Sequence, residues 1–88
     1  MPTYEVEHAW NANETNSVVA KVQEAIGAAK AGKLPPGFRP VSIVGLPGQT
    51  KAHCLWEAPS PQALDEMFTK SGLKTTRTIR EVTPFFVR

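Results

Sequence analysis

The chain has 88 residues, of which 41% are apolar, and a formal net charge of +2. This length predicts one domain over residues 1–88. The positive charge is too small to argue for a nucleic-acid partner, and no apolar run approaches the roughly 20 residues of a membrane-spanning helix. The single cysteine, Cys54, excludes an internal disulfide and is typical of a reducing compartment. Because the N-terminus reads as a strand and not as a signal peptide, we expect a cytoplasmic protein.

Residues 3–9 alternate in the manner of a half-buried strand. Three side chains fall on each face, the first set being Tyr4, Val6 and His8 and the second Thr3, Glu5 and Glu7. A period of two with one charged face predicts a strand. Trp10 continues the first set, and Asn13 or Thr15 can cap a helix that follows.

Residues 15–31 repeat their apolar side chains at a helical period instead. The stripe consists of Val18, Val22, Ala25, Ile26 and Ala29. Such spacing is typical of an amphipathic helix with one buried face, and Gly32 is a natural residue to end it. Because Gly27 costs about 1 kcal/mol relative to alanine, this helix must be stabilised by tertiary packing.

A β-hairpin is expected next. Residues 41–46 and 51–58 are rich in the β-branched and apolar residues that favour strands. Between them, LPGQ places Pro47 and Gly48 at the two central positions of a type II turn. The preceding segment, KLPPGFRP, is expected to be a loop, because consecutive prolines interrupt helices and central strands.

A second helix and a last strand complete the pattern. Ser60 is a good N-cap, Pro61 suits the first helical position, and Gly72 ends the helix. Residues 74–88 are β-rich, although Pro84 limits pairing near their end. The order is the ferredoxin-like βαββαβ unit, an α+β fold with a four-stranded antiparallel sheet and both helices on one face. The other face is left bare, and we expect a second copy of the chain to cover it.

The stretch CLWEAPSPQALDEMFTKSGL, followed by IREVTP, resembles the dimeric α+β-barrel proteins. The corner from Trp56 to Pro59 and the Ala-Leu-Asp-Glu segment that begins at Ala63 carry the similarity. Within that superfamily the chain is similar to two families of uncharacterised bacterial proteins, DUF4242, which includes a nickel-binding protein, and DUF3303. The resemblance implies a homodimer with its sheets face to face and a small-molecule cavity between sheet and helices. Related DUF4242 sequences often have a histidine in the second helix, near the positions of Met67 and Phe68 here, and this departure argues against carrying over a metal site.

Aromatic and apolar residues supply material for a ligand pocket, namely Tyr4, Trp10, Trp56, Met67 and Phe68. Small-ligand sites use such walls, but so do cores, and both interpretations stay open. His8 is the best polar group for such a pocket, because it shares a face with Tyr4 and Trp10. Its imidazole titrates near neutrality and could serve as an acid or a base.

His8 and His53 are the only histidines, and the strands that carry them are neighbours in a ferredoxin-like sheet. With Glu7 or Glu57 they could hold Ni²⁺ or Zn²⁺, although we favour two partly exposed strand histidines. His53 and Cys54 point to opposite faces of their strand. The sequence places no base or cation next to Cys54, so we interpret it as a buried structural thiol and not as a nucleophile.

The C-terminal residues suggest two surfaces. Lys74, Arg77 and Arg80 give the last strand a basic side, which could bind an anion or protect a sheet edge. Phe85 and Phe86 are costly in water, so we expect them to pack at a dimer interface or on their own subunit.

Together these features predict a homodimeric protein that binds a small apolar or aromatic molecule. A binding or accessory protein without a cofactor is the interpretation we favour over an enzyme, because no catalytic constellation is present. The alternatives are a cofactor-free monooxygenase or isomerase with His8 as its acid or base, and a metal-binding protein that uses His8 and His53. Neither a nucleic acid nor a membrane is expected as a partner.

Overall fold

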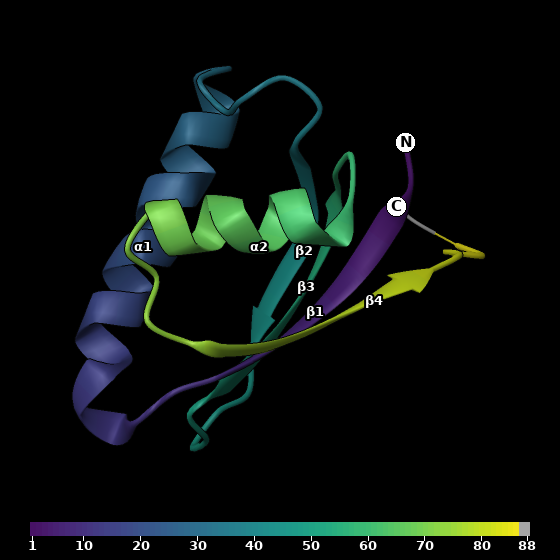
Figure 1. Ribbon diagram of the computed structural model, residues 1–88. Coiled ribbons are helices and arrows are strands. Elements are labelled where there is room, and N and C mark those ends of the chain that lie inside the picture. Colours follow the sequence, from purple (N-terminus) through teal and green to yellow (C-terminus); the bar gives the residue numbers. More distant parts are fainter. Residues whose placement is uncertain (87–88) are drawn as a thin grey trace.

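Four strands and two helices follow one another in the order that the sequence predicts (Figure 1). The computed structural model describes residues 1–86. Its elements are β1 (Thr3–Ala9), a 3₁₀ turn (Ala12–Glu14), α1 (Thr15–Lys30), β2 (Arg39–Gly45), β3 (Lys51–Glu57), α2 (Pro61–Lys70) and β4 (Thr76–Val82). This confirms the α+β, ferredoxin-like βαββαβ arrangement.

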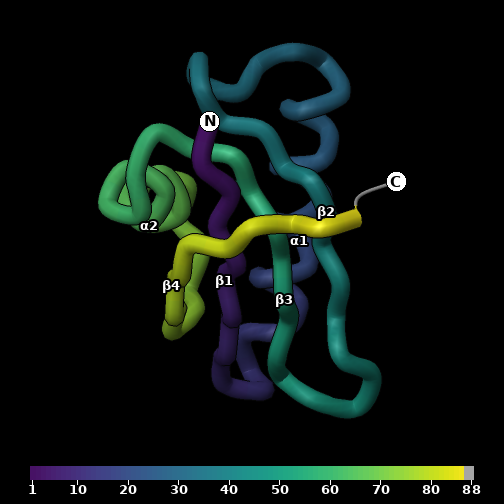
Figure 2. Tube along the Cα trace, turned by 90° about the vertical axis from the view of Figure 1, so that its right-hand side faces the viewer, coloured from purple at the N-terminus to yellow at the C-terminus, as the bar shows by residue number. Residues whose placement is uncertain are grey.

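The strands form one antiparallel sheet in the order β2-β3-β1-β4, so that β1 and β3 are its central strands. Both helices lie on the same side of this sheet (Figure 1). Figure 2 looks at the sheet from the side that faces away from the helices, so the strands are in front and α1 lies behind them. We call these two sides the helix face and the open face.

The register of the two central strands decides which side chains share a face. Val6 pairs with Cys54, and His8 pairs with Ala52. Since side chains alternate along a strand, these four residues all point to the helix face. The core there is built on Val6, Trp56 and Leu64, which have the largest of the completely buried side chains. Burial of such side chains contributes about 1.5–3 kcal/mol each.

The two helices begin differently. Ser60 caps α2 as predicted, because its hydroxyl oxygen accepts a hydrogen bond from the Ala63 N–H at 3.0 Å, and Pro61 follows it. The predicted cap of α1 by Asn13 or Thr15 is wrong, since no side chain caps that helix. Instead the 3₁₀ turn runs directly into α1. Within the turn, the Glu14 N–H donates to the Asn11 carbonyl at 2.8 Å, and the N–H of Thr15, the first residue of α1, donates to the Ala12 carbonyl of the turn.

The hairpin between β2 and β3 follows the expected turn chemistry. Gly48 has a φ of +72°, and the Gln49 N–H donates to the Leu46 carbonyl at 3.1 Å. However, β2 begins two residues earlier than predicted, at Arg39. It is an edge strand, and its register shifts between Pro40 and Ser42. An edge position with a bulge accommodates a proline that a central strand would not.

Beyond β4 the chain turns away from both helices and projects from the open-face side (Figures 1 and 2). Among the helices of residues 1–86, none has both the length and the apolar character that crossing a bilayer requires.

Candidate functional site

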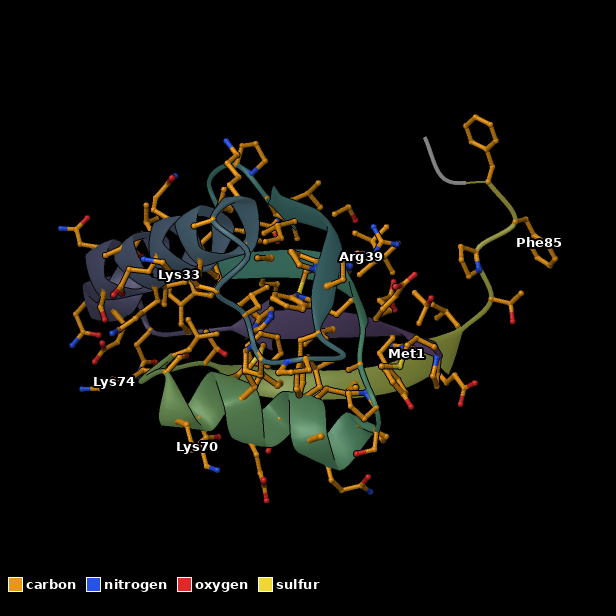
Figure 3. All side chains as sticks on the ribbon, turned by 90° about the horizontal axis from the view of Figure 1, so that it is seen from above. Met1, Lys33, Arg39, Lys70, Lys74 and Phe85 are labelled. Atoms are coloured by element: carbon orange, nitrogen blue, oxygen red, sulfur yellow. The ribbon has the colours of Figure 1, made fainter. Side chains whose placement is uncertain are left out.

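A cavity of about 290 Å³ lies between the helix face of the sheet and the two helices. Its wall on the α1 side includes Val18, Val22, Ala25 and Ala28. Val18, Val22 and Ala25 belong to the predicted apolar stripe of α1, whereas Ala28 was not part of it. The two alanines are too short to fill the space between helix and sheet. Side chains from both helices and from the sheet converge on this region (Figure 3). The cavity therefore arises from small residues at the helix–sheet contact.

Four of the five predicted ligand-binding residues line this cavity, namely His8, Trp10, Trp56 and Phe68. The fifth, Tyr4, is buried in the adjoining core and is not part of the wall. The aromatic rings are packed edge to face: Phe68 lies at 82° to the His8 ring and at 89° to the Trp56 ring, with centroids 5.1 and 5.6 Å away. Such contacts hold the rings of the wall in fixed orientations.

The helix face places His8 next to Cys54, which sequence reasoning did not anticipate. His8 Nε2 lies 3.2 Å from the Cys54 sulfur, and His8 Nδ1 lies 2.9 Å from the Thr75 hydroxyl oxygen. Both ring nitrogens are therefore engaged. The alternation of β1 and β3 contained the signal, because it put His8 and Cys54 on helix-facing positions of neighbouring strands.

Arg77 extends these contacts from the wall to the surface. Its guanidinium donates to the Thr75 hydroxyl oxygen at 3.2 Å, to the Thr69 hydroxyl oxygen at 2.7 Å and to the Asp65 carboxylate at 2.8 Å. It also lies over the ring of Phe68, 5.4 Å from the centroid. Only 9% of the Arg77 side chain is exposed. Arg77 thus links Asp65 and Thr69 of α2 to Thr75, whose hydroxyl contacts the His8 ring.

Burial keeps the His8–Cys54 pair uncharged at neutral pH. Loss of water, with a smaller contribution from the charges of Arg77 and His53, lowers the pKa of His8 to about 4. Burial also raises the pKa of the Cys54 thiol to about 12, against a weaker opposing effect of a hydrogen bond between the Trp56 indole and the sulfur. A neutral imidazole and a neutral thiol are the stable forms, which supports the interpretation of Cys54 as a structural thiol.

The two tryptophans of the cavity wall differ in one respect. The Trp10 indole N–H donates to the Thr15 hydroxyl oxygen at 3.0 Å. The Trp56 indole nitrogen has only its weak interaction with the Cys54 sulfur, and it is the single buried side-chain nitrogen or oxygen of residues 1–86 without a partner at full hydrogen-bond geometry. A buried donor without a partner costs about 1–3 kcal/mol. Trp56 is only 1% exposed, so it is not satisfied from the outer surface of the chain.

The rest of the cavity wall carries few polar groups. Lys21 and Glu24 of α1 form an ion pair with 3.3 Å between ammonium nitrogen and carboxylate oxygen, and both residues line the cavity. Ser71, which also lines it, donates its hydroxyl to the Phe68 carbonyl at 2.7 Å. The Lys21 and Glu24 side chains are 35% and 67% exposed. These charges therefore lie toward solvent, and the interior of the cavity is neutral.

The register separates the two histidines that the sequence analysis considered as metal ligands. His53 pairs with Glu7, so it shares the open face with that residue, whereas His8 points to the helix face. They do not form the joint site that the sequence suggested. Within the part of the chain that the structure describes, no group of three or more His, Cys, Asp or Glu side chains could hold a metal ion.

The expected basic side of the last strand is likewise not formed. Arg77 lies on the helix face against Asp65, whereas Arg80 forms ion pairs with Glu5 and Glu7 on the open face. That prediction is wrong because residues three apart in a strand point to opposite faces. Both arginines are already paired with carboxylates, so neither offers a free cation to an anionic ligand.

The C-terminal phenylalanines do not pack on their own subunit. Phe85 is 99% exposed and Phe86 is 85% exposed. Figure 3 shows Phe85 on the projecting segment, away from the body of the chain. Of the two predicted packing modes, packing on their own subunit is therefore wrong, and contact with a partner stays a prediction.

Comparisons of the chain with protein-family models, with curated proteins and with solved structures found no match. The resemblance to the DUF4242 and DUF3303 families therefore stays a prediction from the sequence. What the chain can do must be inferred from the cavity and its wall.

Proposed function

We propose that this protein binds a small, mainly apolar or aromatic molecule in the cavity between its sheet and its two helices. The observation that carries the proposal is a cavity of about 290 Å³ whose wall is aromatic and aliphatic and contains a few buried polar groups. Ligand sites of proteins have this composition. A binding or accessory role is favoured over nucleophilic catalysis, because the thiol in the wall has a pKa of about 12.

The volume limits the size of the occupant. A dry cavity of roughly 150 Å³ is enough to bind benzene. The cavity here is about 290 Å³, which suits a molecule of one or two rings or a short branched chain. Most of its contacts would be apolar, so its affinity would come from the hydrophobic effect and from dispersion.

The test is native mass spectrometry of the gently purified chain without chelator, followed by extraction and identification of any retained organic mass. Ala25 lines the cavity and Ala20 is exposed on the same helix, so the variants Ala25→Phe and Ala20→Phe form a matched pair. The proposal expects the organic mass to be lost in Ala25→Phe and kept in Ala20→Phe. Equal retention by both variants would place the bound molecule elsewhere.

The proposed binding protein is a homodimer in which a second copy covers the open face. The exposed Phe85 and Phe86 support this, because they belong to the segment that projects from the open-face side beyond β4, and two exposed apolar side chains are costly in water. Leu55 and Val44 are further apolar residues at open-face positions of the sheet. A second copy would bury these side chains together by two-fold symmetry.

A cofactor-free enzyme of the monooxygenase or isomerase type is the second candidate. His8 favours it, because the ring lines the cavity and its pKa of about 4 makes it a neutral imidazole at pH 7. Such a ring can accept a proton from a bound molecule when one of its nitrogens gives up its contact with Cys54 or with Thr75. If quinol or lactone turnover were observed and were unchanged in His8→Ala, that candidate would be removed.

A further inference from the structure

The buried polar side chains of the cavity wall are occupied by contacts within the protein. His8 Nε2 contacts the Cys54 sulfur at 3.2 Å, and His8 Nδ1 contacts the Thr75 hydroxyl oxygen at 2.9 Å. The Trp10 indole N–H donates to the hydroxyl of the first residue of α1. The Trp56 indole nitrogen is enclosed by the protein and interacts with the Cys54 sulfur. Most of the other wall residues belong to helices and strands, whose backbone groups bond to one another. A polar group of a ligand would therefore lose its hydration inside the cavity without gaining a partner.

A second set of polar side chains lies at the solvent side of the cavity, which we call the mouth: Lys21, Glu24 and Ser71. These side chains are half-buried or exposed. Lys21 reaches from α1 to the end of α2, because its ammonium nitrogen lies 3.7 Å from the position that a Cβ would take at Gly72. The mouth is thus framed by α1 on one side and by the end of α2 on the other.

The mouth can both donate a hydrogen bond to a ligand and accept one from it. An ammonium group has three N–H donors, and Lys21 uses one of them in its ion pair with Glu24 at 3.3 Å. The Ser71 hydroxyl donates to the Phe68 carbonyl, so its oxygen is still able to accept. Because the cation and the anion lie side by side, a charged group would be attracted by one and repelled by the other. A neutral hydroxyl group, which donates and accepts, is compatible with both.

We propose that the ligand is a neutral amphipathic molecule with an apolar body and a hydroxyl group at one end, and that this end lies at the mouth beside Lys21 and Ser71. The apolar body lies inside the cavity, against Phe68, Trp10 and the aliphatic side chains of α1. A hydroxyl group in the middle of the molecule is disfavoured, because it would be buried without a partner. This inference rests on the proposed function, since it requires that a small molecule enters the cavity. It adds the chemical class of the ligand and its orientation.

The test uses two pairs of probes in which a methyl group replaces a hydroxyl group. In 4-phenylbutan-1-ol and pentylbenzene the exchanged group is at the end of the chain, whereas in 1-phenylbutan-1-ol and 2-phenylpentane it is next to the ring. The affinities of all four probes are measured for the wild-type chain. The proposal expects the hydroxyl group to weaken binding about tenfold more next to the ring than at the end, which is the effect of one missing hydrogen bond. The hydrocarbon of each pair corrects for differences in shape.

The variants Lys21→Met and Lys30→Met locate the hydroxyl group, since Lys30 is an exposed residue at the end of α1 that does not line the cavity. Lys21→Met should reduce the preference for the terminal hydroxyl group by about threefold and should hardly change the affinity for pentylbenzene. Lys30→Met should keep the preference of the wild-type chain. If the hydrocarbons bind but the two hydroxyl positions are equivalent, or if Lys21→Met keeps the full preference, the placement at the mouth is wrong while ligand binding stands. If none of the four probes binds, both the inference and the proposed function fail.

Discussion

His8 and Cys54 face each other across the two central strands, with 3.2 Å between the imidazole Nε2 and the sulfur. In an exposed site this pair would suggest an activated thiol. Here the pKa values of about 4 for His8 and about 12 for Cys54 differ by about 8. Moving the proton from sulfur to nitrogen would cost on the order of 10 kcal/mol before the attraction between the resulting ions is counted. The pair is therefore a hydrogen-bonded part of the cavity wall and not a nucleophile with its base.

The first prediction concerns the reactivity of Cys54 toward a thiol reagent. Its pKa is raised from 9.0 to about 12, so the thiolate fraction near neutral pH falls about a thousandfold. In a time course with Ellman's reagent, the folded chain should react at least a thousand times more slowly than the chain in guanidinium chloride. Fast labelling of the folded chain at pH 7 would contradict the neutral pair and favour a reactive site.

The second prediction is a loss of stability as the pH falls from about 6.5 to about 4. Burial lowers the pKa of His8 from 6.5 to about 4, so in this window the unfolded chain binds a proton that the folded chain does not. The free energy of unfolding should therefore be full above pH 6.5 and should decrease by about 3 kcal/mol toward pH 4. Urea unfolding curves at several pH values measure this change.

Two variants test whether His8 causes that pH dependence of the free energy of unfolding. His8→Gln keeps a hydrogen-bonding group but removes the titration, so most of the slope between pH 6.5 and 4 should vanish. His53→Gln, on the open face, should keep the slope of the wild-type chain. If the two variants behave alike, the pH dependence does not come from His8.

Most of the fold could be predicted from local patterns. The period of two in residues 3–9 gave β1 with its observed bounds, and Ser60 with Pro61 marked the start of α2. These signals are short-range, since they depend on side-chain alternation and on capping. The start of β2 was missed because a proline interrupts a central strand but not an edge strand. Whether a strand is at an edge is decided by the whole sheet.

The site was harder to predict, because it depends on distances between elements. The sequence predicts that the strands of His8 and Cys54 are neighbours, but their contact at 3.2 Å depends on the register between these strands. The contacts of Arg77 with Asp65 and Thr69 depend on how α2 packs over β4. The periodicity of apolar residues in α2 and β4 does not show how these two elements pack on each other. The size of the cavity likewise depends on the separation of α1 from the sheet.

The third prediction compares two arginines of β4. Arg77 is 9% exposed and contacts Asp65, Thr69, Thr75 and Phe68, whereas Arg80 is 54% exposed and pairs with carboxylates on the open face. Arg77→Leu should lower the free energy of unfolding by about 2–4 kcal/mol, because it leaves buried groups without partners. Arg80→Leu should cost less than about 1 kcal/mol. Urea unfolding at pH 7 gives both values, and a larger loss for Arg80→Leu would contradict this ranking.

The fourth prediction concerns the exposed C-terminal phenylalanines. If a second copy covers the open face, replacing both with serine (Phe85→Ser and Phe86→Ser) removes apolar contacts between subunits and should weaken the dimer at least tenfold. The stability of the isolated subunit should change little, because these side chains are 99% and 85% exposed within it. Light scattering coupled to size-exclusion chromatography, over a range of concentrations, measures the dimer fraction.

The matched control for that double variant is Val19→Ser. Val19 is also apolar and 51% exposed, but it belongs to α1. That helix lies on the side of the sheet opposite to the open face (Figure 2). Val19→Ser should therefore leave the dimer fraction unchanged, because a partner on the open face would not touch this residue. A wild-type chain that stays monomeric at all concentrations would rule out the second copy. A double variant that dimerises as well as the wild type would show that the phenylalanines do not contribute to the interface.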